Sequence, residues 1–300
     1  MKNKQDFQIR RVMKKCHIVL GKLLSESGHI YDITAIGGKK TNDRCCKVFI
    51  GCTQGEAISE YTIGRLCYEK DNRHFMRVYD LIPFTIKDDI FDNREKNCWA
   101  VIMEKGIPFT IIPEPKYVSF YVKFLTDITQ AVCTLHRLNF VHFDIKPDNI
   151  VINKNGDFCL IDFGISKAID DGTINLYDIS GSRYYMAPEI FRTELSRQAD
   201  IYSLGTTVRF ILLNGVHEFS TYGKSIKELC QLKKNLEPLR SEDEYVQQFL
   251  DIVNKMSAYY PEERYADMEE IRKELAGFPV RRDIRLYSAG KYHDAHKANL

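Results

Sequence analysis

The segment HFDIKPDN, residues 142–149, places a carboxylate, an ammonium and an amide side chain within one short stretch. These groups belong to Asp144, Lys146 and Asn149, and the downstream segment IDFG adds the carboxylate of Asp162. Carboxylate and amide oxygens suit Mg²⁺, which proteins usually hold together with substrate phosphates. A lysine two residues after Asp144 can offset negative charge on a transferring phosphoryl group. The combination indicates metal-assisted phosphoryl transfer.

The elements around these residues are predicted to leave them on loops. Apolar residues recur at i, i+3, i+4 and i+7 from Val118 to Leu135, which predicts a long amphipathic helix. Two short strands, NIVI and FCLI, follow, and the strong turn signal NKNG joins them as a hairpin. Asp144 therefore lies between the helix and the hairpin, and Asp162 lies just past the hairpin.

The chain as a whole is predicted to be β-rich first and helical afterwards. Its first hundred residues hold short β-like runs and one helical pattern, GEAISEYTIGRLC, with Ile58, Ile63 and Leu66 near one face. After about residue 117 helical patterns dominate, and ADIYSLGTTVRFILLNG is the most apolar and so the most buried. We expect an α+β protein with a boundary near Lys105 and Gly106.

Composition is consistent with a globular intracellular protein. The chain has 300 residues, 44% of them hydrophobic and 28% charged, so it can bury a sizeable core. Nine cysteines without a C-x-x-C pair indicate reduced thiols in the cytosol. No segment reaches the ~20 apolar residues of a membrane span, and the N-terminus does not resemble a secretory signal. We expect a cytoplasmic protein.

Four ordered motifs resemble those of eukaryotic-type (Hanks-type) serine/threonine protein kinases, over about residues 18–275. HFDIKPDN resembles the catalytic loop H-R-D-x-K-x-x-N, and DFG is intact. GSRYYMAPE resembles the end of the activation segment, and DIYSLG the start of the central buried helix. The resemblance implies a bilobal protein-kinase-like fold. Its expected parts are a basic N-terminal arm (1–17), an N-lobe (18–105), a C-lobe (106–277) and a basic polar C-terminal tail (278–300).

The resemblance assigns roles to the phosphoryl-transfer residues. Asp144 would accept the proton of the substrate hydroxyl, and Lys146 would touch the γ-phosphate. Asn149 and Asp162 would hold Mg²⁺. Ser182 would contact the catalytic Asp and favour Ser or Thr in the substrate. The implied cofactors are ATP and Mg²⁺, and the implied partner is a protein substrate with a Ser or Thr acceptor.

The resemblance also implies an ATP-binding set. Lys47, in the strand-like run RCCKVFI, matches the lysine that grips the α- and β-phosphates. Its expected helix partner is Glu60, with Glu56 as the second choice. Met103 is similar to the gatekeeper residue at the end of its strand. The segment from Glu104 to Gly106 would form the hinge that contacts adenine.

Four further residues are expected to support the site without reacting. The resemblance implies a buried ion pair between Glu189 and Arg264. It also implies that Asp200 anchors the backbone of the catalytic loop and that His142 braces this loop.

The first departure from the family pattern is Phe143, which replaces the arginine that normally precedes the catalytic Asp. That arginine pairs with a phosphate on the activation segment, and phenylalanine cannot make the pair. We therefore expect that activity does not require a phosphate on Thr173 or Ser180.

The second departure is the glycine-rich loop that covers the ATP phosphates in the family. The corresponding stretch SESGHIYD, residues 25–32, keeps only Gly28, although Ser25 and Ser27 are small enough to turn tightly. Loose phosphate cover with weakened nucleotide affinity is the expectation.

Two other readings stay open at this stage. The degenerate glycine-rich loop and Phe143 suggest a pseudokinase, which would bind nucleotide or act as an allosteric scaffold. A small-molecule kinase shares the Asp, Asn and Asp arrangement, but the GSRYY and APE segments argue for an extended peptide substrate.

Residues 1–22 hold seven Lys or Arg against one acidic residue, and a solvated arm is favoured there over contact with nucleic acid or an anionic surface.

Overall fold

The computed structural model describes residues 2–25, 29–51, 54–87, 95–109, 116–169, 182–192, 196–278 and 285–286. Its contacts divide the chain into two compact units. The N-terminal unit comprises Met1–Ile107 and Val151–Ile165, and the C-terminal unit comprises Pro108–Ile150 and Ser166–Leu300. The hairpin that follows the catalytic loop in sequence thus belongs to the N-terminal unit.

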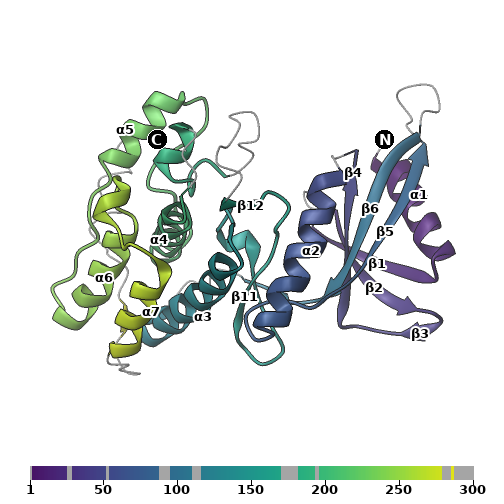
Figure 1. Ribbon diagram of the computed structural model, residues 1–300, viewed down its shortest axis with the longest axis horizontal. Coiled ribbons are helices and arrows are strands. Elements are labelled where there is room, and N and C mark those ends of the chain that lie inside the picture. Colours follow the sequence, from purple (N-terminus) through teal and green to yellow (C-terminus); the bar gives the residue numbers. More distant parts are fainter. Residues whose placement is uncertain are drawn as a thin grey trace. The chain divides into compact units, whose positions relative to one another are not determined.

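A six-stranded antiparallel sheet forms the N-terminal unit (Figure 1). Its order is β1–β2–β4–β6–β5, with β3 paired to β2. Side chains alternate between its two faces, so that Cys46 and Val48 lie in one apolar cluster while Cys45 and Phe49 lie in the other. The strands are β1 (Ile18–Ser25), β2 (Ile30–Ile36), β3 (Lys39–Lys40), β4 (Arg44–Ile50), β5 (Val78–Lys87) and β6 (Glu95–Glu104).

Helix α2 (Gln54–Lys70) packs on the face of the sheet that carries Cys45 and Phe49. The predicted helix is present, but its predicted apolar face is only partly buried, because Ile63 is 3% exposed whereas Ile58 is 41% exposed. The buried residues are Ala57, Glu60, Ile63, Gly64 and Cys67. The helix lies close to the sheet at Gly64, where a Cβ would lie 2.8 Å from a methyl group of Val78.

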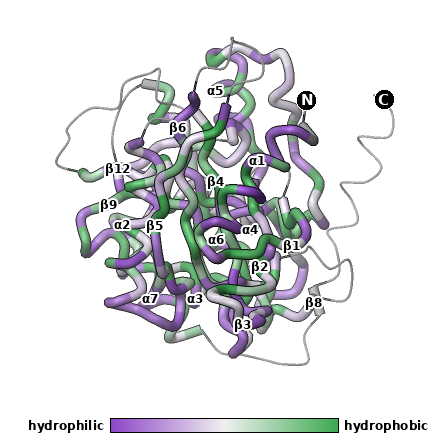
Figure 2. The backbone as a smooth tube through the Cα atoms, turned by 90° about the vertical axis from the view of Figure 1, so that its right-hand side faces the viewer, coloured by the Kyte–Doolittle hydropathy of each residue, from purple (hydrophilic) through white to green (hydrophobic). Residues whose placement is uncertain are grey.

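Helix α1 (Lys2–Lys15) packs on the opposite face of the sheet. Ile9 and Met13, one turn apart, are 1% and 0% exposed and join the apolar cluster of that face. Arg10 donates to the carbonyl oxygens of Leu20 and Gly21 at 3.0 and 2.7 Å. The expectation of a solvated arm over residues 1–22 is therefore wrong for α1, which carries both hydrophilic and hydrophobic residues (Figure 2).

Helices form most of the C-terminal unit. The predicted amphipathic helix is α3 (Val118–Arg137), and the predicted buried helix is α4 (Gln198–Leu212), in which every residue from Ala199 to Arg209 is buried. The other helices are α5 (Ile226–Lys234), α6 (Glu244–Met256) and α7 (Met268–Gly277). A β-rich unit followed by a helical one confirms the α+β class.

Short strands complete the two units. The predicted hairpin consists of β10 (Ile150–Ile152) and β11 (Phe158–Leu160), and Gly156 in its turn has a φ of +80°, which favours glycine. Strand β7 (Ile107–Pro108) precedes them in the chain. In the C-terminal unit, β9 (Phe140–Val141) pairs with β12 (Lys167–Ala168), and β8 (Lys116–Tyr117) pairs with β13 (Arg285–Leu286). Part of the expected tail thus belongs to a two-stranded sheet.

None of the helices within the described ranges combines the length and the apolar character that crossing a membrane requires. The eight cysteines that the structure describes are all free thiols.

The packing of α1 can be tested by truncating Met13. We expect Met13→Ala to lower the free energy of unfolding by about 2–5 kcal/mol, because it empties a fully buried site. Urea denaturation followed by circular dichroism measures the change. Phe7→Ala is the control on the same helix, since Phe7 is 63% exposed, and it should change stability by no more than about 0.5 kcal/mol. Equal effects of the two variants would contradict a packed α1.

Candidate functional site

Lys47 is a buried cation between two carboxylates of the N-terminal unit. It lies in the middle of β4, on the face that α2 covers, and is only 8% exposed. Its Nζ lies 3.3 Å from Oε2 of Glu60 and 2.7 Å from Oδ1 of Asp162. Glu60, rather than Glu56, is thus the helix residue that pairs with Lys47, and three predicted site residues meet here.

The charges of this cluster depend on one another. Burial by itself lowers the pKa of Lys47, but the negative charges of Glu60 and Asp162 outweigh burial and raise that pKa above its usual range. Lys47 therefore stays cationic at neutral pH. Burial raises the pKa of Glu60, and the charge of Lys47 opposes this shift. The pKa of Glu60 is nevertheless raised above its usual value, because burial outweighs the charge of Lys47.

The DFG segment is bound to α2 through the same glutamate. The backbone N–H of Phe163 donates to Oε2 of Glu60 at 2.7 Å. Asp162 has a φ of +72°, a left-handed conformation that non-glycine residues seldom adopt and that is concentrated at functional sites. The strained backbone aims the Asp162 carboxylate at Lys47 while its neighbour is fixed to Glu60.

The predicted hinge lies at the end of β6, and hydrogen bonds hold its backbone in place. Met103 is 7% exposed, and the N–H groups of Glu104 and Lys105 donate to carbonyl oxygens of the unit at 2.7 and 2.8 Å. A Cβ on Gly106 would lie 2.5 Å from Cγ2 of Val151, so this position requires glycine.

The predicted phosphate-covering loop can be followed only at its start. Ser25 is the last residue of β1, whereas Ser27 and Gly28 lie outside the described residues.

Asp144 is the centre of a hydrogen-bonded group in the C-terminal unit. Nζ of Lys146 lies 2.6 Å from Oδ2 of Asp144 and donates to Oγ of Ser182 at 3.1 Å. Nδ2 of Asn149 donates to the same Oδ2 at 2.9 Å and to the backbone oxygen of Asp144 at 2.8 Å. The N–H of Ser182 donates to Oδ1 at 3.3 Å. Four predicted site residues are thus in direct contact.

Asp200, at the start of α4, anchors the loop that carries Asp144. Its side chain has no exposed surface. Oδ2 accepts from the N–H of His142 at 2.9 Å, and Oδ1 accepts from the N–H of Phe143 at the same distance. Nδ1 of His142 in turn accepts from the N–H of Asp144 at 3.2 Å. Asp200 and His142 thus both bind the backbone of the loop that carries Asp144.

Phe143 is buried within this loop, at 9% exposure, and has a φ of +66°. A bulky residue rarely takes this conformation unless its surroundings enforce it. The hydrogen bond from its N–H to Asp200 supplies part of that constraint.

Comparison with known proteins decides the family. Residues 108–275, more than half of the chain, match the family described as the protein kinase domain. The chain belongs to this family. The resemblance that the motifs carry is therefore confirmed.

Curated relatives of this kinase domain share shorter stretches. The mitosis inhibitor protein kinase mik1 of Schizosaccharomyces pombe is 39% identical over 87 residues, 29% of this chain and 15% of that protein. The dual specificity protein kinase zak2 of Dictyostelium discoideum is 39% identical over 95 residues, 29% of this chain and 15% of that protein. The probable serine/threonine-protein kinase PknB of Lactococcus lactis is 28% identical over 158 residues, 52% of this chain and 25% of that protein. The matched region spans a quarter or less of each relative.

The kinase domain also contains the expected buried ion pair. Both terminal nitrogens of Arg264 contact the carboxylate of Glu189, at 2.6 and 2.9 Å. The Arg264 side chain has no exposed surface, and it also donates to the carbonyl oxygens of Ala258, Gln198 and Tyr259. The pair ties the APE segment to the region before α7.

Sequence reasoning missed two residues that hold the catalytic loop. Nε2 of His136, on α3, lies 2.9 Å from Oδ2 of Asp200. The hydroxyl of Thr207, on α4, donates to the carbonyl oxygen of Ile145 at 3.1 Å. The sequence could have indicated Thr207, because a buried hydroxyl in so apolar a run must have a hydrogen-bond partner. It could not have indicated His136, since the partner of this residue lies 64 positions away.

The buried ion pair gives a test of stability that does not depend on activity. We expect Glu189→Gln to lower the free energy of unfolding by about 3–5 kcal/mol, because it leaves the Arg264 charge buried and uncompensated. The matched control is Glu69→Gln. It breaks the exposed Arg65–Glu69 pair, whose 3.8 Å contact should be worth less than about 1 kcal/mol. Denaturant unfolding of both variants makes the comparison, and similar losses would count against the buried pair.

Proposed function

We propose that this kinase domain transfers the γ-phosphoryl group of ATP to Ser or Thr hydroxyls of protein substrates in an Mg²⁺-dependent reaction. The observation that carries the proposal is the group around Asp144. Its carboxylate is fixed by Lys146 and Asn149, and Ser182 lies beside it. A turn-forming aspartate needs no such set of partners.

Asp144 would act on the substrate hydroxyl. Its carboxylate accepts the hydroxyl proton, the freed oxygen attacks the γ-phosphorus, and the bond to the β–γ bridging oxygen breaks so that ADP leaves. Lys146 would place its ammonium against the transferred group, because it lies 2.6 Å from the carboxylate that receives the proton. Most of the catalytic contribution is positioning and charge stabilisation.

Lys47 would hold the α- and β-phosphates. It is cationic, largely desolvated and fixed by Glu60, so its attraction for phosphate oxygens is stronger than that of a surface lysine. Met103 and the backbone from Glu104 to Gly106 would contact the adenine ring. Ser25, Ser27 and Gly28 would cover the phosphates loosely.

The donor chemistry fits Mg²⁺. Nδ2 of Asn149 donates to Asp144, which leaves Oδ1 as the end of the amide for a cation. Asp162 supplies a carboxylate that is 38% exposed, and both are hard oxygen donors. Mg²⁺ would neutralise charge on the phosphate oxygens, and these two residues would hold it.

Ser182 favours a protein substrate with a Ser or Thr acceptor. Its hydroxyl accepts from Lys146, so it lies within reach of the group that handles the substrate hydroxyl. The name of PknB agrees with this class, whereas the name of zak2 includes dual specificity. Phosphate on tyrosine as well as on serine would place this domain closer to the second relative.

We further propose that the activation segment needs no phosphate. Phe143 offers no cation for a phosphate, and its loop is fixed instead by the buried Asp200. Thr173 and Ser180 lie outside the described residues.

Transfer should depend on Asp144. We expect Asp144→Asn to lower kcat by about 10²–10⁴-fold, since the amide cannot accept the hydroxyl proton. Labelled ATP with Mg²⁺ and a basic protein substrate measures the rate, and Asp162→Ala should also abolish labelling. Asp148→Asn is the control, because Asp148 is exposed and on the same loop. Nucleotide binding by a wild-type protein that transfers no label would instead favour the pseudokinase.

The phosphate requirement is tested separately. We expect Thr173→Ala and Ser180→Ala to keep kcat/KM within about twofold of wild type, because no arginine precedes Asp144 to read a phosphate. Ser182→Ala should lower activity, since it removes the hydroxyl that contacts Lys146. A phosphate on Thr173 or Ser180 that activity follows, as seen by mass spectrometry, would overturn the proposal.

A further inference from the structure

Tyr184 is held at both ends within the C-terminal unit. It lies two residues after Ser182 and is 5% exposed. Its hydroxyl donates to Oε2 of Glu218 at 3.3 Å, and its backbone oxygen accepts from Nζ of Lys233 at 2.5 Å. The ring also packs against His217 and Phe219, with centroids 4.2 and 4.9 Å away. We call Lys233, Glu218 and Arg209, which binds Glu218, the Tyr184 clamp.

Lys233 is an unusual residue to bury. It lies in the last turn of α5, is 1% exposed, and its Nζ is 5.1 Å from the ring centroid of Tyr202 and 5.4 Å from that of Phe219. Burial lowers the pKa of Lys233 to about 7. Removing an ammonium from water costs free energy that apolar packing does not return. A methionine would fill such a site without that cost, but it could not make the hydrogen bond from Nζ to the backbone oxygen of Tyr184.

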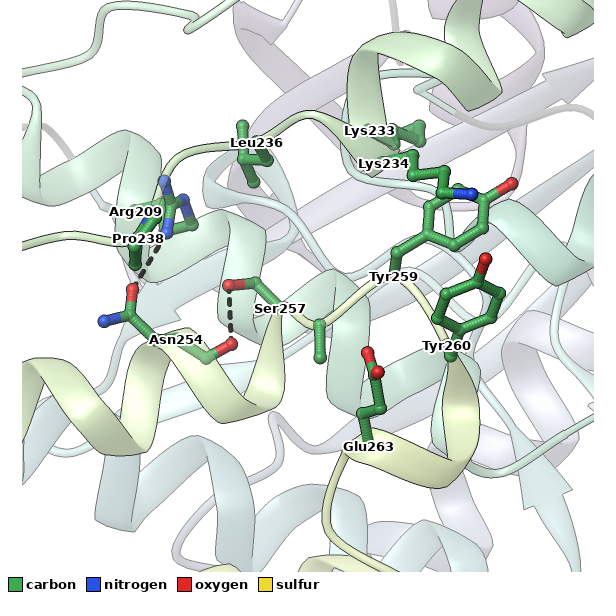
Figure 3. A pocket seen from close by; sticks show the side chains of 11 residues that line it. Arg209, Lys233, Lys234, Leu236, Pro238, Asn254, Ser257, Tyr259, Tyr260 and Glu263 are labelled. Atoms are coloured by element: carbon green, nitrogen blue, oxygen red, sulfur yellow. Dashed lines mark hydrogen bonds between the residues drawn. The ribbon is translucent and has the colours of Figure 1, made fainter.

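The other end of the clamp consists of Arg209 and Glu218, whose side chains are 2% and 12% exposed. Arg209, on α4, contacts Glu218 through Nε and Nη2, at 3.0 and 2.6 Å. Its Nη1 donates to Oδ1 of Asn254, and this bond is drawn in Figure 3. Arg209 and Lys233 line one cavity of about 270 Å³ together with Lys234 of α5 (Figure 3). The bidentate pair fixes the carboxylate to which the Tyr184 hydroxyl donates.

The clamp is connected to the catalytic loop by a short path of contacts. Ser182 donates its N–H to Asp144 and accepts from Lys146. The N–H of Tyr185 donates to the backbone oxygen of Ser182 at 2.9 Å, which closes a turn around Tyr184. A shift of Tyr184 would therefore move Ser182 relative to Asp144.

We propose that Lys233 and Glu218 are positioning residues that hold residues 182–186, through Tyr184, in the conformation that receives the peptide substrate beside Asp144. The inference rests on the proposed function and deepens it. It supplies a tether of hydrogen bonds from the protein itself, whereas Phe143 offers no cation that could bind a phosphate. The peptide backbone and the acceptor side chain are what the held segment would recognise.

The decisive variant is Lys233→Met, with Lys234→Met as its matched control. Lys234 is the next residue of the same helix and is exposed, and its Nζ lies 5.5 Å from the ring centroid of Tyr260. Both changes replace a lysine of the same helix with an apolar residue of similar length, but only the first removes the bond to Tyr184. Replacing a buried charge with an apolar residue of similar size is often neutral for stability. We therefore expect both variants to keep a Tm close to that of wild type.

Two readouts follow residues 182–186. Hydrogen exchange, measured by mass spectrometry, should be at least about tenfold faster at these residues in Lys233→Met than in Lys234→Met, because the tether of Tyr184 is gone. The KM for a peptide substrate should rise about tenfold, while the KM for ATP stays unchanged. A merely structural role would lower Tm and both affinities together. Equal exchange and equal peptide KM in the two variants would overturn the clamp.

The exchange measurement separates this inference from the proposed function. A wild-type protein without transfer activity contradicts the function, whereas unchanged exchange at residues 182–186 contradicts the clamp. If Lys233→Met does not fold, Tyr184→Phe replaces it, because it removes only the hydroxyl that donates to Glu218. We expect faster exchange at the same residues in this variant, and exchange equal to wild type would overturn the clamp.

Discussion

Asp200 is the constraint on which the catalytic half of the molecule depends. Its carboxylate has no exposed surface, yet it accepts from two backbone N–H groups of the loop 142–146 and lies 2.9 Å from a ring nitrogen of His136. A buried carboxylate is stable only when such partners are complete. The loop must therefore take the one backbone path that supplies them, and this path includes the positive φ of Phe143. The position of Asp144 follows from that path.

The N-terminal unit uses the same principle with different residues. Glu60 is 2% exposed and is satisfied by Lys47 and by the N–H of Phe163. This requirement turns α2 so that Glu60 faces the sheet, and it sends Ile58 to solvent although Ile58 is the more apolar residue. Buried charge, more than hydrophobic area, therefore decides which face of α2 is inside and where Lys47 and Asp162 meet.

Local patterns predicted most of the elements and the catalytic loop, because periodicity and motif spacing lie within short stretches. The α3 and α4 helices, the β10–β11 hairpin and the neighbours of Asp144 are of this kind. The packing of helix α1 was not predicted, since the seven basic residues among the first 22 suggested a solvated segment, although two apolar residues lie one turn apart. The Tyr184 clamp was hidden for another reason. Lys233 and Tyr184 are 49 positions apart, and no local pattern marks a lysine whose partner is a distant carbonyl oxygen.

The two buried arrangements also explain why a phenylalanine before the catalytic Asp is compatible with an ordered site. An arginine there orders the activation segment only when a phosphate supplies the opposite charge. Here the segment after Ser182 already has partners within the protein, because Lys233 and the Arg209–Glu218 pair bind Tyr184. Permanent partners hold one conformation at all times, whereas a phosphate holds it only after modification. If the proposed clamp operates, residues 182–186 would keep one conformation without a phosphate, although Phe143 offers no cation to bind one.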